Sequence, residues 1–351
     1  MKLQRLVWGA AILACAAAFL AVQDWVRLHR GGAGLVGRTL IGPVDLAVAG
    51  IVLIETPAGQ VTLERTPWGW VVHEQDRFAA DLEQMRALLQ RLSRATIATR
   101  VPVRPERLGE LGLLQKVENG WRFERGRTAS VLSVIHSLER QHRTIYQVLI
   151  GNPHSAGRGT YVRFPSTNTA YLVAEPLALD GRAERWIDRR VFPAGAVESL
   201  RQVHVRTPGR PPVRLSRAGP GSPWRLAGLE APAPAAPVDE LLTALTGLRI
   251  EAVSTRGAAR QAADNATAVE AGFFDGRVVT LMLHPPDGGA DRPPRGQLAA
   301  RLGPEPGARD DRALRSAVAR FNHRFATRVV TLERGQVAPL LRGRAAYRPR
   351  P

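Results

Sequence analysis

The sequence predicts an α+β protein in which an N-terminal transmembrane helix precedes a duplicated module of β-β-β-α plus a β-hairpin. An uncharged apolar run near the N-terminus predicts the helix, and the same order of apolar patterns in both halves of the chain predicts the duplication. Alternation of apolar and polar residues predicts strands that bury one face. We divide the 351 residues into a membrane anchor (1–25), a juxtamembrane tether (26–45), two repeat halves (46–199 and 200–345) and a tail (346–351).

The predicted anchor is an apolar run, residues 6–22, that contains no charged side chain and follows Lys2 and Arg5. A helix of these 17 residues would reach about 26 Å, close to the roughly 30 Å of a hydrocarbon core. A signal peptide cleaved near the small residues 16–18 and a lipidated Cys15 are the two alternatives. The anchor residues are Leu6, Trp8, Leu13, Phe19, Leu20, Val22 and Trp25, with the two tryptophans at the two membrane interfaces.

The charges on the two sides of this run predict an orientation. Arg27 and Arg30 follow it and compete with Lys2 and Arg5 under the positive-inside rule. A short N-terminus ordinarily stays in the cytoplasm, and a long domain is translocated largely regardless of its charge. We therefore expect a single-pass protein of the bacterial inner membrane with its C-terminal domain in the periplasm.

In the first half, alternating apolar residues predict strands at 51–57, 61–63 and 70–72. A helix is predicted over 79–93, because apolar residues recur there every three or four positions. The predicted helix stripe consists of Leu82, Met85, Leu89 and Leu92.

The second half repeats this order, with strands predicted at 203–208, 213–215 and 224–226 and a helix over 238–248. Prolines in the run 231–237 favour extended backbone and delay the start of that helix. Its apolar stripe consists of Val238, Leu241, Leu245 and Leu248.

The later parts of the two halves also correspond. Residues 149–153 resemble 301–304, and residues 169–173 resemble 327–332. Before residue 149 the first half contains an extra segment, 115–143, which we interpret as helical because Val131, Val134, Ile135 and Leu138 form an apolar stripe.

The composition is strongly basic, with a formal net charge of +18 and a pI near 11.4. Of the 49 basic residues only Lys2 and Lys116 are lysines, and the arginines are spread along the chain. A dispersed positive surface raises nonspecific affinity without defining a site, so nucleic acid is not expected as a partner. The single cysteine excludes a disulfide within the chain.

The sequence contains no HExxH, GxSxG or Walker-type motif, and no GxGxxG that follows a strand. We therefore predict no catalytic residue, no metal and no cofactor. One candidate anion-binding loop consists of Gly151, Gly157, Arg158 and Gly159, whose amides and guanidinium suit an anion. The alternative is a plain hairpin loop between two strands.

The order of several motifs carries a family resemblance. The pattern V-x-I-x-T-P-x-G-x-V-x-L-x-R spans 52–65, and G-W-x-V follows at 69–72. Further motifs are LGELGL at 108–113, LIG at 149–151, GTYVR at 159–163, TAYLV at 169–173 and WIDRR at 186–190. Over residues 50–250 the chain resembles the bacterial domain-of-unknown-function family 4340. The resemblance implies a membrane-tethered envelope protein associated with ABC-type transporters and gliding-type auxiliary systems, and it supplies no catalytic residues.

Three functional hypotheses follow. The first is a non-enzymatic, single-span envelope protein that serves as an accessory or scaffold subunit linked to an ABC-type transporter. The second is a binding module for an anionic envelope ligand, either acidic lipid or glycan. The third is a hydrolase with unrecognised spacing, which would need a nucleophile beside a base.

Overall fold

The computed structural model consists of two compact units, each assembled from two stretches of the chain. The first unit is Met1–Thr62 with Glu83–Arg182, and the second is Leu63–Leu82 with Ala183–Pro351. The residues described are 34–42, 48–115, 124, 126–138, 141–155, 158–193, 195–255, 265–284, 293–303 and 311–348.

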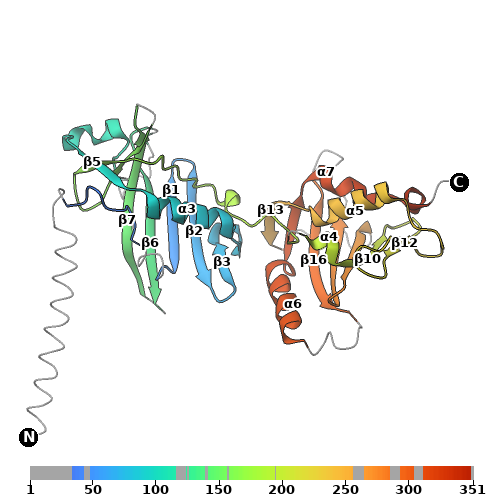
Figure 1. Ribbon diagram of the computed structural model, residues 1–351. Coiled ribbons are helices and arrows are strands. Elements are labelled where there is room, and N and C mark those ends of the chain that lie inside the picture. Colours follow the sequence, from blue (N-terminus) through green and yellow to red (C-terminus); the bar gives the residue numbers. More distant parts are fainter. Residues whose placement is uncertain are drawn as a thin grey trace, which may run out of the picture. The chain divides into compact units, whose positions relative to one another are not determined.

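The first sheet has nine strands in the order β4-β3-β2-β1-β6-β7-β8-β9-β5 (Figure 1). Its long central pairs, β6 with β7 and β7 with β8, are antiparallel. The strands are β1 (Ile51–Thr56), β2 (Gly59–Thr66), β3 (Gly69–Val72), β4 (Phe78–Ala79), β5 (Ile97–Val101), β6 (Ser130–Leu138), β7 (Gln141–Pro153), β8 (Thr160–Arg163) and β9 (Ala170–Val173).

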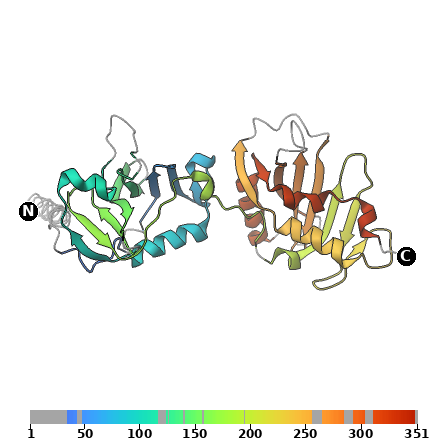
Figure 2. The same ribbon diagram turned by 90° about the horizontal axis from the view of Figure 1, so that it is seen from above.

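Burial along β1 shows why this segment is a strand. Val52, Ile54 and Thr56 are buried and alternate with more exposed residues, as the period of two requires. Helix α3 (Leu82–Arg94) instead buries Met85, Leu88 and Leu92, which share one helix face. Figures 1 and 2 show this helix crossing one face of the sheet. Short 3-10 helices are η1 (His73–Gln75), η2 (Pro105–Leu111) and η3 (Ala183–Arg185).

The second sheet has eight strands in the order β12-β11-β10-β14-β15-β16-β17-β13. The strands are β10 (Leu200–Arg206), β11 (Val213–Ser216), β12 (Arg225–Leu226), β13 (Ile250–Thr255), β14 (Thr267–Phe273), β15 (Arg277–His284), β16 (Arg295–Leu302) and β17 (Arg328–Leu332). The helices of this part are α4 (Ala196–Ser199), α5 (Ala235–Thr246), α6 (Arg312–Phe325), α7 (Arg334–Val337), η6 (Ala338–Leu341) and η7 (Arg344–Tyr347).

The two sheets share one strand order. Counted from β3, the first sheet has the order β3-β2-β1-β6-β7-β8-β9-β5, and its edge strand β5 follows α3 in the chain. From β12 to β13 the second sheet runs through the corresponding strands, with α5 in the place of α3. The first sheet adds β4 at one edge, and the second inserts α6 between β16 and β17.

The predicted α+β class is wrong, because the described residues form two large antiparallel sheets with few helices. The segment 115–143, interpreted as helical, contributes strand β6. Val131 and Val134 have helical spacing, but Leu132 and Ser133 between them are also buried. A central strand covered on both faces has no clean alternation, so its apolar run imitates a helix.

The predicted transmembrane helix is corrected as well. Within the part of the chain that the structure describes, none of the helices has both the length and the apolar character needed to cross a membrane. The anchor residues from Leu6 to Trp25 lie outside the described residues. The membrane and signal-anchor assignment is therefore not retained for this fold.

Candidate functional site

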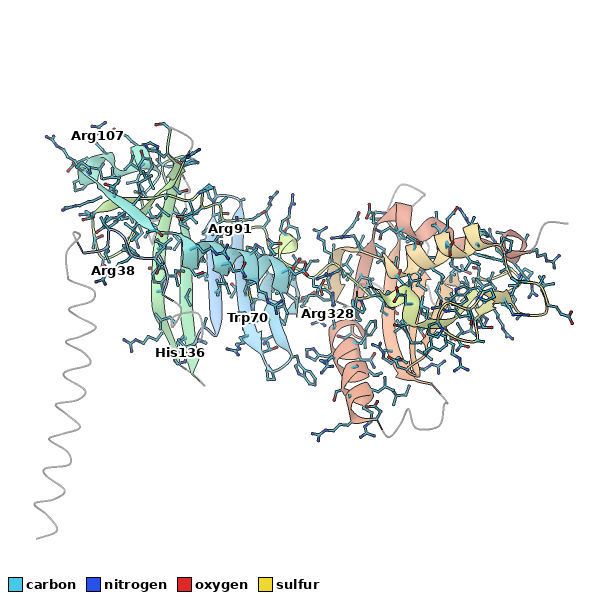
Figure 3. All side chains as sticks on the ribbon, in the orientation of Figure 1. Arg38, Trp70, Arg91, Arg107, His136 and Arg328 are labelled. Atoms are coloured by element: carbon cyan, nitrogen blue, oxygen red, sulfur yellow. The ribbon has the colours of Figure 1, made fainter. Side chains whose placement is uncertain are left out.

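A cavity of about 150 Å³ lies beside α6 in the second unit. Its lining combines cations with aromatic rings from two stretches of that unit, the β2–β4 region and the segment from the second half of α6 to the first residue of β17. The lining residues are Trp68, Trp70, Val71, Arg77, Ala79, Arg320, His323, Arg324 and Arg328; Trp70 and Arg328 are labelled in Figure 3.

The aromatic wall is the stacked pair of Trp68 and His323. Their ring centroids lie 5.0 Å apart at an interplanar angle of 23°, and Trp68 remains 55% exposed. Local hydrogen bonds hold the turn that carries the indole: the Thr66 hydroxyl accepts from the Trp68 amide at 3.2 Å and donates to the Gly69 carbonyl at 2.7 Å. The indole is therefore presented by a braced turn rather than by a packed core.

Arg324 forms the most enclosed part of the lining. Its guanidinium carbon lies 5.0 Å from the centre of the Phe78 ring and 4.7 Å from that of Phe325. One terminal nitrogen pairs with the Asp188 carboxylate at 3.0 Å, and the other donates to the carbonyls of Asp188 and Arg190 at 2.6 and 2.8 Å. Burial lowers the pKa of Arg324 and the nearby Asp188 opposes that shift, but an arginine stays protonated at any ordinary pH. Arg324 therefore supplies a fixed positive charge whose terminal donors are already used.

Arg328 is fixed in the same way. Its guanidinium donates to the carbonyls of His323, Arg324 and Asp76, each at 2.8 Å. Burial lowers the pKa of Arg328, and the charge of Asp76 opposes this. This arginine also holds backbone in place.

The remaining two arginines differ in what they leave available. Arg77 pairs with Glu64 at 2.9 Å through one nitrogen of its guanidinium. Arg320 is exposed, and within the described residues no hydrogen bond or ion pair engages it. The guanidinium of Arg320 is therefore the one in the described lining that no described protein group engages.

The charges and rings of the cavity suit the binding of an anion. The lining residues that the structure describes include no Ser, Thr, Cys, Asp or Glu. Among the described residues no group of three or more His, Cys, Asp and Glu side chains is placed to hold a metal ion. The cavity places positive charge beside an indole face, which favours an anionic ligand that carries a flat ring.

Of the predicted anion-binding loop, Gly151 lies within β7, Arg158 and Gly159 lie between β7 and β8, and Gly157 lies outside the described residues. Gly151 packs so closely that a Cβ there would overlap the Leu111 carbonyl oxygen. Gly159 has φ +96°, and its carbonyl accepts from the His154 amide at 3.1 Å. Tight backbone packing thus accounts for these two glycines, while Arg158 is exposed beside them.

Two further arginines, one buried and one partly buried, show why the basic composition does not by itself indicate a polyanion site. Arg163, only 5% exposed, donates to the carbonyls of Leu113 and Thr167. Arg217 donates to the carbonyls of Val197 and Leu200 at 2.8 and 2.7 Å. The exposed arginines are scattered, as Arg38, Arg91 and Arg107 on different elements illustrate in Figure 3.

Sequence reasoning did not find the cavity, although one signal was present. Arg320, His323 and Arg324 follow the i, i+3, i+4 spacing that places side chains on one helix face. Trp68 is more than two hundred positions earlier in the chain, and single-sequence patterns do not report which distant segments meet.

Fold and cavity together define a protein of two like antiparallel sheets with a cavity lined by arginines and aromatic rings. The family described as "Domain of unknown function (DUF4340)" matches residues 70–269, which is more than half of the chain. The chain belongs to this family, and the resemblance seen in its motifs is confirmed. Neither the curated proteins nor the solved structures that were searched contain a significant match.

Proposed function

We propose that the protein is a non-enzymatic accessory or scaffold subunit of the bacterial envelope, which acts outside the cytoplasm and binds its partner or ligand beside an ABC-type transporter. One observation supports the non-enzymatic part of this proposal: the described lining of the cavity beside α6 combines fixed cations with aromatic rings and includes no Ser, Thr or Cys side chain. The location and the transporter follow from what the family resemblance implies.

A hydrolase would need a nucleophile within hydrogen-bond reach of a base. The candidate base in the described lining is His323, and its ring is stacked on Trp68. None of the described lining side chains carries a hydroxyl or a thiol. Holding an anion in place needs only donors and charge, and the lining has both. Binding is therefore the role that this geometry favours.

The test uses the full chain with a C-terminal reporter that is active only outside the cytoplasm, followed by crosslinking in cells and affinity purification. The proposal expects reporter activity and co-purified transporter subunits. Reporter activity confined to the cytoplasm would refute the location, and capture of soluble enzymes without any transporter subunit would refute the accessory role.

A matched pair of variants makes the capture informative. Arg320→Gln removes the open cation of the cavity, while Arg312→Gln removes the same charge from the exposed start of the same helix. If the cavity contacts the partner, the amount of co-purified transporter subunits falls for Arg320→Gln but not for Arg312→Gln.

A further inference from the structure

The cavity beside α6 has two accessible groups with unused capacity. Arg320 has no bonding partner within the described residues, and Trp68 is half exposed although one side of its ring stacks on His323. The other arginines of the lining add charge from fixed positions, because backbone carbonyls and carboxylates already hold them. A ligand would thus meet one free guanidinium and one indole surface in a positive field.

The charge of the site selects an anion. Three carboxylates lie at its borders, those of Glu64, Asp76 and Asp188, against the four arginines of the lining. A guanidinium matches a carboxylate with two parallel hydrogen bonds, which fixes orientation as well as charge. The free fork of Arg320 is suited to such a group.

The surroundings select the body that carries the anion. An acyl chain needs an apolar surface, yet Trp68 is the one exposed large apolar side chain in this lining. The other exposed large apolar side chains of the described residues are elsewhere and scattered: Val36, Val48, Leu82, Leu229 and Leu341. A single indole face instead matches the small apolar face of a sugar ring, whose hydroxyls remain in water.

From these observations we infer that the cavity beside α6 binds an acidic sugar, with the carboxylate of a hexuronic acid unit on Arg320 and the ring of that unit against Trp68. The inference rests on the binding role proposed above and names its ligand class. It does not depend on the transporter.

The test measures binding of a galacturonic acid tetramer to the full chain by calorimetry, with a glucose tetramer as the neutral probe. We expect the acidic tetramer to bind and the neutral one to bind at least about tenfold more weakly, the ratio for losing one well-placed charged contact. Arg320→Gln and Trp68→Ala should each weaken binding of the acidic tetramer about tenfold. Trp68→Phe keeps an aromatic face, so its affinity should fall less than that of Trp68→Ala.

Arg312→Gln is the matched control, since it removes an equal charge from the same helix outside the cavity. An equal loss in this variant would reduce the effect to net charge and overturn the site. Absence of binding to the acidic tetramer, equal binding of the neutral tetramer, or full competition by inorganic phosphate would overturn the ligand class. Binding to phosphatidylglycerol vesicles in place of the sugar would do so too.

Failure of this inference and failure of the proposed function are distinguishable. If the tetramer does not bind but transporter subunits co-purify, the accessory role stands without the sugar. If the tetramer binds and no transporter subunit is captured, the sugar site stands alone.

Discussion

The two sheets share a strand order but differ in one connection. In the first sheet, β8 and β9 are joined by the short segment between Arg163 and Ala170. In the second sheet, the corresponding strands β16 and β17 are separated by α6, and their pairing is limited to Arg295 and Gly296 of β16. The added helix contributes Arg320, His323 and Arg324 to the candidate cavity, so part of the candidate site lies outside the repeated framework.

An arginine secures this connection in both sheets, but with different partners. Arg163 donates only to main-chain carbonyls, those of Leu113 and Thr167. Arg324 also pairs with the Asp188 carboxylate. Removal of Arg324 therefore breaks an ion pair, whereas removal of Arg163 breaks hydrogen bonds to carbonyls only. The two substitutions should differ in how far they lower the free energy of unfolding.

The largest effect is expected from Arg324→Met. This change keeps a long side chain between two phenylalanine rings. It removes the closer ion pair of Asp188, which keeps its contact with Arg190 at 3.6 Å, and it takes one donor from each of two carbonyls. We expect the free energy of unfolding to fall by about 3 kcal/mol, measured by urea denaturation. Arg163→Met leaves two carbonyls without this donor but affects no carboxylate. It should lower the free energy of unfolding by about half as much.

Arg320→Met on the same helix is the reference for these two variants. Its guanidinium is exposed and unbonded within the described residues, so stability should change by less than about 0.5 kcal/mol. Equal losses for Arg163→Met and Arg324→Met would show that the carboxylate adds nothing to the second connection.

A second prediction uses two glycines that the sequence pattern treats as equivalent, Gly151 and Gly303. Alanine at 151 would overlap the Leu111 carbonyl oxygen, whereas alanine at 303 would place its Cβ 3.0 Å from the Gly276 carbonyl oxygen. We expect Gly151→Ala to lower the free energy of unfolding by about 2 kcal/mol and Gly303→Ala by clearly less. Thermal unfolding of the two variants side by side would decide, and a larger loss at position 303 would contradict the packing described.

The third prediction concerns Asn322, the side chain that joins α6 to β16. Its amide accepts from the Ala300 amide at 2.7 Å and donates to the Ala300 carbonyl at 2.8 Å, which replaces a missing strand partner. Asn322→Leu should cost about 2 kcal/mol, because it leaves both main-chain groups of Ala300 without a partner. Asn322→Asp keeps the acceptor and should cost less in urea denaturation, and an equal cost would indicate that the donor to the carbonyl carries the effect.

The elements that sequence predicted well are those with one buried face. The strands expected at 51–57 and 203–208 correspond to β1 and β10, and the apolar stripes indicated α3 and α5. Strand β6 was not predicted, because both of its faces are buried and its sequence therefore does not alternate between apolar and polar residues. The likeness of 149–153 to 301–304 was misleading, since β7 and β16 hold different places in the strand order.

The candidate site was beyond sequence for a different reason. Trp68 and Arg320 each look like ordinary exposed residues, and only folding brings their segments to one cavity. Arg324 and Arg163 show the complementary error: a basic residue in the sequence looks like surface charge, but here it satisfies buried carbonyls. Charge counts therefore overstate how much of the net +18 is free to meet a ligand.

The smallest predicted effect is on the pH dependence of stability. It arises at one cross-strand position where the side chains differ between the two sheets. In the first sheet Leu53 lies opposite Ser133, and neither titrates near neutral pH. In the second sheet the corresponding β10 residue, His204, lies between Arg214 and Glu270. Its Nε2 accepts from the Arg214 guanidinium at 3.3 Å, so the folded protein favours the neutral imidazole.

Burial first, and then the charge of Arg214, lowers the pKa of His204, while Glu270 partly opposes this. The unfolded chain then binds more protons than the folded one as pH falls below about 6.5, so the stability due to the neutral ring is present above that pH and lost below it. His204→Gln keeps an acceptor for Arg214 without titrating. We expect the melting temperature of the variant to fall less than that of the parent between about pH 7 and about pH 5, and parallel curves would show that His204 contributes nothing to the acid sensitivity of the second sheet.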